Sequence, residues 1–183
     1  LYFFYSILSY LLLPLVLIYL WLKSFKQPDY RKNFSQRLGL AGPVATKPVI
    51  WVHGASVGEI TAATPLIRQL LQSYPNKTLL ITTVTPTGAA WARETFGDDV
   101  LHCYLPLDAG FAVRGFIKRF RPEFAVIMET EIWPTLYGEL NQQSIPIIIA
   151  SARLSQKSVD GYARFLSLIK TALSGNVSIA AQT

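Results

Sequence analysis

The stretch Val49-Ile50-Trp51-Val52-His53-Gly54-Ala55-Ser56-Val57-Gly58-Glu59 decides the fold. It opens with a short apolar run rich in valine and isoleucine, which is typical of a strand buried on both faces. Two glycines and a serine follow, and a helical pattern begins at Ile60. A strand, a tight turn and a helix in this order predict the first unit of a parallel α/β sheet.

The same alternation continues along the chain. Short apolar runs predict strands over Val49–His53, Leu79–Thr83, Val100–Leu105, Phe124–Met128, Ile145–Ala150 and Val177–Ala181. Helical periodicity predicts helices over Ile60–Tyr74, Phe111–Phe120, Ile132–Gln143 and Ser158–Leu173. Strand–helix repetition with right-handed crossovers predicts an α/β fold with a Rossmann-like parallel sheet over residues 48–183.

Residues 1–22 contain no charged side chain, and this run is long enough to cross a bilayer as a helix. A cleaved signal peptide carries basic residues before its apolar core, whereas here they follow it. A buried core helix would rarely lack charges on every face. We therefore expect a membrane-anchor helix over residues 1–22, which either spans the bilayer or lies in its interface.

Residues 23–47 are polar, basic and rich in proline and glycine, which predicts a juxtamembrane linker with one short helix around Tyr30–Leu38. The positive-inside rule then places the rest of the chain in the cytoplasm, because five basic residues follow the anchor against Asp29 alone: Lys23, Lys26, Arg31, Lys32 and Arg37. The single cysteine, Cys103, excludes a disulfide-stapled extracytoplasmic domain.

The formal net charge of +6 favours contact with an anionic leaflet. Nucleic acid is a weaker candidate, because no basic-aromatic motif or zinc spacing accompanies the charge. A basic face of the third predicted crossover could instead meet anionic headgroups or phosphates; it comprises Arg114, Lys118, Arg119 and Arg121.

Open parallel sheets bind ligands beyond the carboxyl ends of their strands, which directs attention to residues 54–59, 84–88, 106–110, 129–134 and 151–155. In the first of these loops, Ser56 and Gly58 form a tight turn whose N–H groups can face an anion at a helix N-terminus. The loop also matches G-x-S-x-G, the nucleophile elbow of α/β-hydrolases. A hydrolase also needs an acid and a histidine later in the chain. The histidine that follows Ser56, His102, lies inside a predicted strand, so we keep the hydrolase only as the alternative.

Glutamate residues follow the first and fourth predicted strands, in loops that lie at the same edge of the sheet. Glu59 is either a dipole partner in the first helical turn or a general base over the cleft. Glu129 and Glu131, two residues apart in a strand-like segment, are expected to point the same way and to raise an apparent pKa by repulsion. Thr130 as a helix N-cap is the structural alternative.

The remaining loops offer groups suited to a polar substrate. Thr85, Thr87 and Gly88 supply hydroxyls and a helix N-terminus for phosphate or sugar oxygens, and Arg153 can pair with phosphate or carboxylate. His53 and His102 are interpreted as structural, and no cluster has metal-ligand spacing, so we expect no metal.

Taken together, these loops resemble the Kdo (3-deoxy-D-manno-octulosonic acid) transferases of lipopolysaccharide biosynthesis. The matching segments, in order, are Gly54-Ala55-Ser56-Val57-Gly58-Glu59, Thr82-Thr83-Val84-Thr85-Pro86-Thr87-Gly88, Tyr104-Leu105-Pro106-Leu107-Asp108, Ile127-Met128-Glu129-Thr130-Glu131-Ile132-Trp133-Pro134 and Ala152-Arg153-Leu154-Ser155. The apolar start followed by Tyr30-Arg31-Lys32 is also similar to the family, so the resemblance covers essentially the whole chain.

The resemblance implies a GT-B glycosyltransferase, with two Rossmann-like domains facing a cleft and this chain as the acceptor-binding half. It implies inverting transfer of Kdo from CMP-Kdo to a lipid A precursor, without a cofactor or a catalytic metal, on the cytoplasmic side of a Gram-negative inner membrane. The family's base matches Glu59, and its second acid matches Glu129 or Glu131.

The family's donor-binding domain follows the point where this sequence stops, so we expect residues 1–183 alone not to catalyse transfer. A hypothesis of a different class is a membrane-tethered module that binds an anionic ligand without chemistry. The two carboxylate-bearing loops argue for the enzyme.

Overall fold

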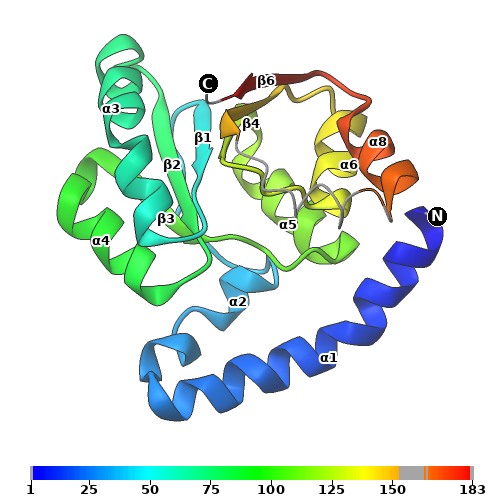
Figure 1. Cartoon of the computed structure of the whole chain (residues 1–183). Helices are drawn as coiled ribbons and strands as arrows, with labels where there is room; N and C mark the ends of the chain where they lie inside the picture. Colours follow the sequence, from blue (N-terminus) through cyan, green and yellow to red (C-terminus); the bar gives the residue numbers. More distant parts are fainter. Residues whose placement is uncertain (1, 153–162, 164, 182–183) are drawn as a thin grey trace.

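In the computed structural model of the chain, which describes residues 2–152, 163 and 165–181, all strands join one parallel sheet (Figure 1). The strands are β1 (Val49–His53), β2 (Thr78–Thr83), β3 (Val100–Tyr104), β4 (Pro122–Met128), β5 (Ile147–Ala152) and β6 (Val177–Ala181). They lie in the order β3-β2-β1-β4-β5-β6, and each neighbouring pair is parallel. The α/β, Rossmann-like prediction is confirmed, and the order is that of a doubly wound sheet.

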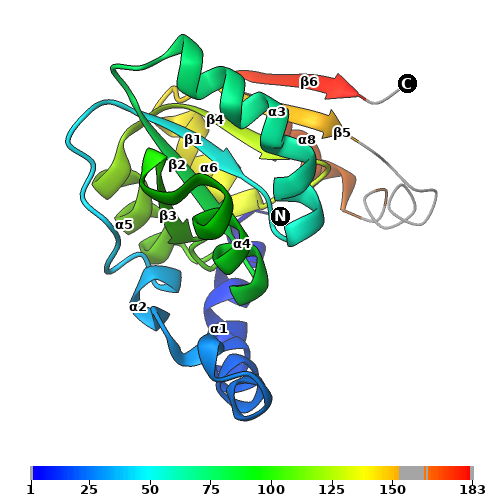
Figure 2. The same cartoon turned by 90° about the vertical axis from the view of Figure 1, so that its left-hand side faces the viewer.

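Helices cover both faces of the sheet. On one face lie α3 (Val57–Ser73) and α4 (Pro86–Phe96), which stand in front of the strands in Figure 2. On the other face lie α5 (Gly110–Phe120), α6 (Pro134–Gln142) and α8 (Leu166–Leu173). The short 3-10 helix η2 (Gly97–Asp99) joins α4 to β3.

The observed bounds differ from the predicted ones mainly at element ends. Helix α4 has no counterpart among the predicted ranges, because its first turn holds a proline and a glycine that weaken the helical signal. Of the predicted helix Ser158–Leu173, residues 158–162 and 164 lie outside the described residues, and α8 accounts for its last turns.

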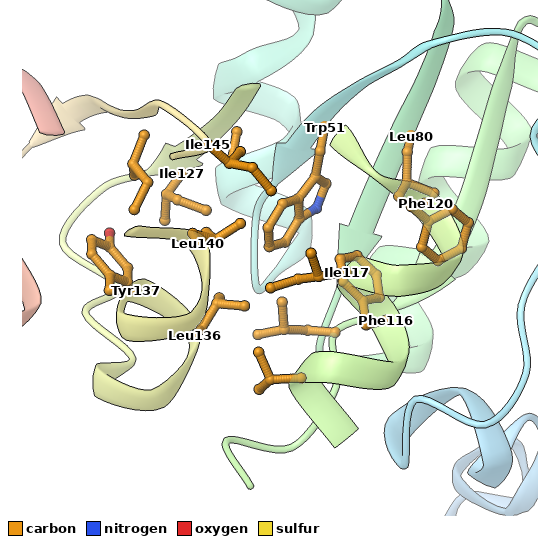
Figure 3. Close-up of a cluster of buried hydrophobic side chains, with 14 of the residues drawn as sticks. Trp51, Leu80, Phe116, Ile117, Phe120, Ile127, Leu136, Tyr137, Leu140 and Ile145 are labelled. Carbon is orange, nitrogen blue, oxygen red and sulfur yellow. The ribbon is translucent and has the colours of Figure 1, made fainter. Parts of the chain in front are cut away.

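Strand β1 supplies side chains to both hydrophobic clusters, as a strand buried on both faces must. Val49 and Trp51 enter the cluster beneath α5 and α6, whereas Ile50 and Val52 enter the cluster beneath α3 and α4. The Trp51 ring lies against Phe116 at 4.9 Å between centroids (Figure 3).

The apolar N-terminal run forms a continuous helix, α1 (Tyr2–Lys26), which extends beyond the predicted end at residue 22. Its mean hydropathy of 2.1 and its length of 25 residues are enough to cross a membrane by length and composition. Figure 1 shows α1 running alongside the domain, beneath the sheet, and not projecting away from it. Most of its large apolar side chains are exposed.

The segment between α1 and β1 contains two short helices instead of the single predicted one. These are η1 (Pro28–Arg31) and α2 (Phe34–Arg37). Asn33, with a φ of 56°, separates them, because a left-handed residue breaks the helical path. The predicted helix around Tyr30–Leu38 is therefore correct in place but not in form.

This segment lies directly on α5. Gly39 has a φ of 68°, and a Cβ atom there would stand 2.0 Å from the carbonyl oxygen of Ala112. On the facing helix, a Cβ at Gly115 would stand 2.6 Å from the carbonyl oxygen of Gly39. Two backbones meet at glycine on both sides, so side chains at either position would separate them. The segment is thus packed on the domain.

A single carboxylate joins α1 to the domain. Asp108, after β3, accepts a hydrogen bond from the Tyr5 hydroxyl at 2.7 Å. It also accepts from the backbone N–H groups of Thr135 at 3.0 Å and Leu136 at 2.8 Å, in the first turn of α6. Burial raises the pKa of Asp108, while these hydrogen bonds act in the opposite direction. Asp108 therefore caps α6 and holds α1 with the same two oxygens.

Phe116→Ala should reduce the free energy of unfolding by about 3–5 kcal/mol, because it removes a ring that packs against both Trp51 and Phe120. Urea unfolding followed by circular dichroism measures the loss. Val44→Ala, at a side chain 78% exposed, is the control and should stay within about 0.5 kcal/mol of the wild type. Equal midpoints for both variants would contradict the assigned core.

Candidate active site

The site lies at the carboxyl edge of the sheet, where the strand order reverses. β1 is paired with β2 on one side and with β4 on the other. From β1 the chain passes to α3 on one face, and from β4 it passes to α6 on the opposite face. The loops after β1 and β4 therefore diverge, and doubly wound sheets bind ligands in the crevice expected at such a point. We refer to this expected binding position as the β1–β4 crevice.

Glu59 lies in the first turn of α3 and points back toward the loop after β1. Its carboxylate accepts a hydrogen bond from the Ala55 N–H at 2.8 Å and another from the Ser56 hydroxyl at 2.8 Å. Ser56 is the N-cap of α3, and its oxygen accepts from the Glu59 N–H at 3.5 Å. This arrangement is a variant of the capping box, in which the carboxylate accepts from the N–H of the residue before the N-cap. The carboxylate is half-buried at the crevice.

Close packing positions the Glu59 loop. Gly54 is buried, and a Cβ atom there would stand 2.6 Å from Ile60 Cδ1 and 3.2 Å from the Cβ of Glu59. The carbonyl oxygen of Ala55 accepts from the N–H groups of Val84 at 3.0 Å and Thr85 at 3.3 Å. The loops after β1 and β2 are therefore joined into one rigid rim.

Glu129 and Glu131 do not form the strand-like pair that we expected. β4 ends at Met128, and Glu129 adopts a φ of 57° in a turn, so the alternation of a strand is broken between the two. Glu129 is exposed, whereas Glu131 is half-buried and accepts from the Trp133 indole N–H at 2.9 Å. The expectation that Thr130 caps the helix is also wrong, because α6 begins at Pro134 with Trp133 as its N-cap.

Glu131, in the loop after β4, lies close enough to Glu59, at the start of α3, for the two carboxylates to interact electrostatically. Burial raises the pKa of Glu131 above its ordinary 4.5, and the charge of Glu59 raises it further. The Trp133 hydrogen bond lowers this pKa, and the Glu129 charge is a smaller raising contribution. Glu59, in the element after the neighbouring strand, therefore raises the pKa of Glu131 more than Glu129 does.

The predicted substrate-binding residues of the first two loops border the same edge. Thr85 is the N-cap of α4 and accepts from the Gly88 N–H at 3.1 Å, and the exposed Thr87 hydroxyl donates to Thr85 at 3.3 Å. Gly58 is exposed in the first turn of α3. Arg153, the remaining candidate, lies outside the described residues.

The geometry does not support the serine hydrolase alternative. Ser56 has an ordinary extended backbone, with φ −127° and ψ 171°, whereas a nucleophile elbow is strained. Its hydroxyl binds Glu59, while His53 binds Thr82 and His102 binds Thr83. Burial lowers the pKa of His53 to about 4 and that of His102 to about 3, so both rings are neutral near pH 7.

Across residues 2–152, 163 and 165–181, no three His, Cys, Asp or Glu side chains gather in a way that could hold a metal ion. Cys103 is buried in β3, and burial raises the pKa of its thiol to about 12.

The predicted basic face borders a hollow of about 540 Å³ near the C-terminal end of α5, which is lined by Arg114, Lys118 and Arg121. Arg114 already pairs with Glu139 at 2.7 Å. Arg119 donates to the carbonyl oxygen of Leu40 at 3.0 Å. Part of this charge is thus used within the fold.

Arg37 was not singled out from the sequence, yet it reaches the site from the segment before β1. Its guanidinium donates to the carbonyl oxygen of Val84 at 2.9 Å, in the loop after β2, and stacks over the Tyr104 ring at 4.0 Å. Its residue is 2% exposed. Local sequence carries no signal for this placement, because it depends on tertiary packing alone.

Comparison with known proteins agrees with this geometry. The family model described as 3-Deoxy-D-manno-octulosonic-acid transferase (kdotransferase) matches residues 32–183. The 3-deoxy-D-manno-octulosonic acid transferase of Haemophilus influenzae is 44% identical over 182 residues, which is 98% of this chain and 43% of that protein. That of Bordetella pertussis is 32% identical over 94% of this chain and 42% of that protein.

The chain therefore spans less than half the length of these two relatives. Among solved structures, a dTDP-glucose 4,6-dehydratase from Bacillus anthracis in complex with NAD aligns over 73% of this chain and 54% of its own. Its TM-score is 0.49 and its sequence identity 14%, values too low to bear on function. The family model and the Haemophilus relative are decisive, and the chain belongs to the Kdo transferase family.

Proposed function

We propose that the full-length protein transfers Kdo from CMP-Kdo to a lipid A precursor in lipopolysaccharide biosynthesis, with inversion at the anomeric carbon. Residues 48–183 supply the acceptor-binding half of a GT-B enzyme, and the donor is bound mainly by a second domain. The observation that carries this proposal is the placement of Glu59 and Glu131 on either side of the β1–β4 crevice in a chain of this family.

The chemistry assigns the proton to Glu59. A sugar hydroxyl of the acceptor attacks the anomeric carbon of Kdo, and a C–O bond forms there as the C–O bond to the CMP phosphate breaks. CMP leaves with the electron pair, and Glu59 accepts the hydroxyl proton as general base. The Ala55 N–H and the Ser56 hydroxyl hold this carboxylate oriented before the substrate arrives.

Glu131 takes the role of the second acid. It is half-buried and coupled to Glu59, whereas Glu129 is exposed on the turn. The Trp133 indole N–H fixes the orientation of Glu131.

The membrane supplies the acceptor. Helix α1 anchors the enzyme to the cytoplasmic face of the inner membrane, and the basic residues that follow it favour an anionic leaflet. Ser56, Gly58, Thr85, Thr87 and Gly88 border the crevice where the acceptor's headgroup would lie. No metal or cofactor enters this proposal.

Glu59→Gln in the full-length enzyme should lower Kdo transfer about a hundredfold or more, the usual loss for a general base. Glutamine keeps an oxygen that can accept from the Ala55 N–H, so the helix cap survives and the loss reports on proton transfer. CMP release and product formation measure the rate. Glu94→Gln, on the exposed side of α4, is the matched control and should retain wild-type activity.

Activity that survives Glu59→Gln would reduce Glu59 to a capping residue and leave the transferase proposal standing. A folded wild-type enzyme without transfer activity would instead overturn the proposal itself.

Glu131→Gln should change how stability depends on pH. The folded state raises the pKa of Glu131, so it binds the proton more tightly than the unfolded chain does, and ionisation costs stability as pH rises through and above 4.5. The variant lacks this cost. The free energy of unfolding of the variant minus that of the wild type, measured in urea, should therefore rise from about pH 4 to about pH 7.

The same series on Glu129→Gln is the comparison, because that carboxylate is exposed. A pH dependence as large for Glu129→Gln as for Glu131→Gln would contradict the assignment of Glu131 as the coupled acid.

A further inference from the structure

Helix α1 contacts the domain near its start, and its end packs on the segment that follows it. Near its start, Tyr5 donates to Asp108, and the Phe111 N–H donates to the Tyr10 hydroxyl at 3.2 Å. Near its end, Leu20 and Ser24 are buried. The less exposed positions recur at helical spacing, as Tyr2, Tyr5, Ser9, Leu13, Leu20 and Ser24. One stripe of α1 therefore faces the domain.

This contact is incompatible with a spanning orientation in the same state. A helix of 25 residues is about 37 Å long, and crossing the hydrocarbon core would carry its first turns about 30 Å away from a domain in water. Here the first turns of α1 hydrogen-bond to the domain. In this arrangement α1 lies along the domain, and its exposed apolar face is available to the lipid interface.

Between α1 and the carboxyl edge of the sheet lies a groove of about 440 Å³. Leu8, Leu12 and Val16 line its α1 side, while Val84, Leu107 and Trp133 line its domain side, one from each of the loops after β2, β3 and β4. The volume is within the range of about 300–1,000 Å³ that small-molecule sites occupy. Its lining is predominantly apolar.

The groove also contains a buried cation. Arg37 lines it, and none of the ion pairs formed within the described part of the chain includes Arg37. Its Nε atom is buried without a hydrogen-bond partner among those residues. The guanidinium donates to the Val84 carbonyl and stacks over Tyr104, but its charge has no carboxylate partner among the described residues. A buried guanidinium in this state has the geometry to bind phosphate or carboxylate. Apolar walls beside such a cation suit an anionic amphiphile.

We propose that this groove receives an acyl chain of the acceptor lipid, with Arg37 paired to an anionic group at the headgroup end of that chain. The inference rests on the proposed function and names how its acceptor is held. Trp133 supports it, because the same indole that lines the groove donates to Glu131. A molecule with its chain in the groove thus has its headgroup beside the carboxylates, which a bulk phospholipid does not need.

Leu12→Trp in the full-length enzyme tests the groove by filling it. Leu11→Trp is the matched control: the same substitution one position away, at a side chain 68% exposed outside the groove. Transfer is measured to a lipid A precursor and to the same disaccharide phosphate with its acyl chains removed. The ratio of kcat/KM for the acylated over the deacylated acceptor should fall about tenfold in Leu12→Trp, the loss of about two buried methylenes. It should be unchanged in Leu11→Trp.

Equal ratios in the two variants would overturn the inference, as would a Leu12→Trp variant that loses binding to phosphatidylglycerol vesicles while keeping the wild-type ratio. In the latter case the groove would hold a bulk phospholipid. Direct binding of radiolabelled acceptor in detergent micelles separates the two proposals. Binding that Leu12→Trp weakens and Leu11→Trp does not, without transfer by the wild type, would support the groove and overturn the proposed function.

Arg37→Gln supplies an independent arm. Removing the acceptor's phosphates should weaken binding to the wild type about tenfold or more, as expected for a charge-assisted pair, and should have little further effect on Arg37→Gln. Melting temperatures of wild type and variant establish that the variant is folded. Equal phosphate dependence in both proteins would remove Arg37 from the site.

Discussion

The burial of β1 on both faces is the constraint on which the rest of the structure depends. On one face of β1, Trp51 packs beneath α5 and α6. On the other face, Ile50 and Val52 pack beneath α3 and α4. A strand so placed must be central, with β2 and β4 as its neighbours, and its chain must leave at the carboxyl edge. Glu59 and Glu131 meet there because the topology reverses at this strand, and no local motif alone would bring them together.

Much of the fold and part of the site could be predicted from sequence. Short β-branched runs are local signals, and parallel strands necessarily bring the loops that follow them to one edge, so the position of Glu59 followed from its place after β1. The conformation of Glu129 did not follow, because a left-handed residue after a strand is set by how the turn packs. Arg37 and the Tyr5–Asp108 bond, between residues 103 apart, have no local signature.

In the proposed mechanism, Glu59 has both a structural and a chemical role. Its carboxylate accepts hydrogen bonds from the Ala55 N–H and the Ser56 hydroxyl at the start of α3, and these bonds fix its orientation. A group held in one orientation by such supporting contacts is preorganised before the substrate binds. The interpretation of Glu59 as a dipole partner and its interpretation as a base are therefore compatible.

The glycine contact between Gly39 and Gly115 has a consequence for substrate choice. Because the segment after α1 packs backbone to backbone against α5, this segment cannot move away from its place without separating the two glycines. If the full-length enzyme acts on a lipid as proposed, this contact would fix the distance between Glu59 and the leaflet. The proposed enzyme would then discriminate between acceptors by how far the reacting hydroxyl stands from the membrane surface.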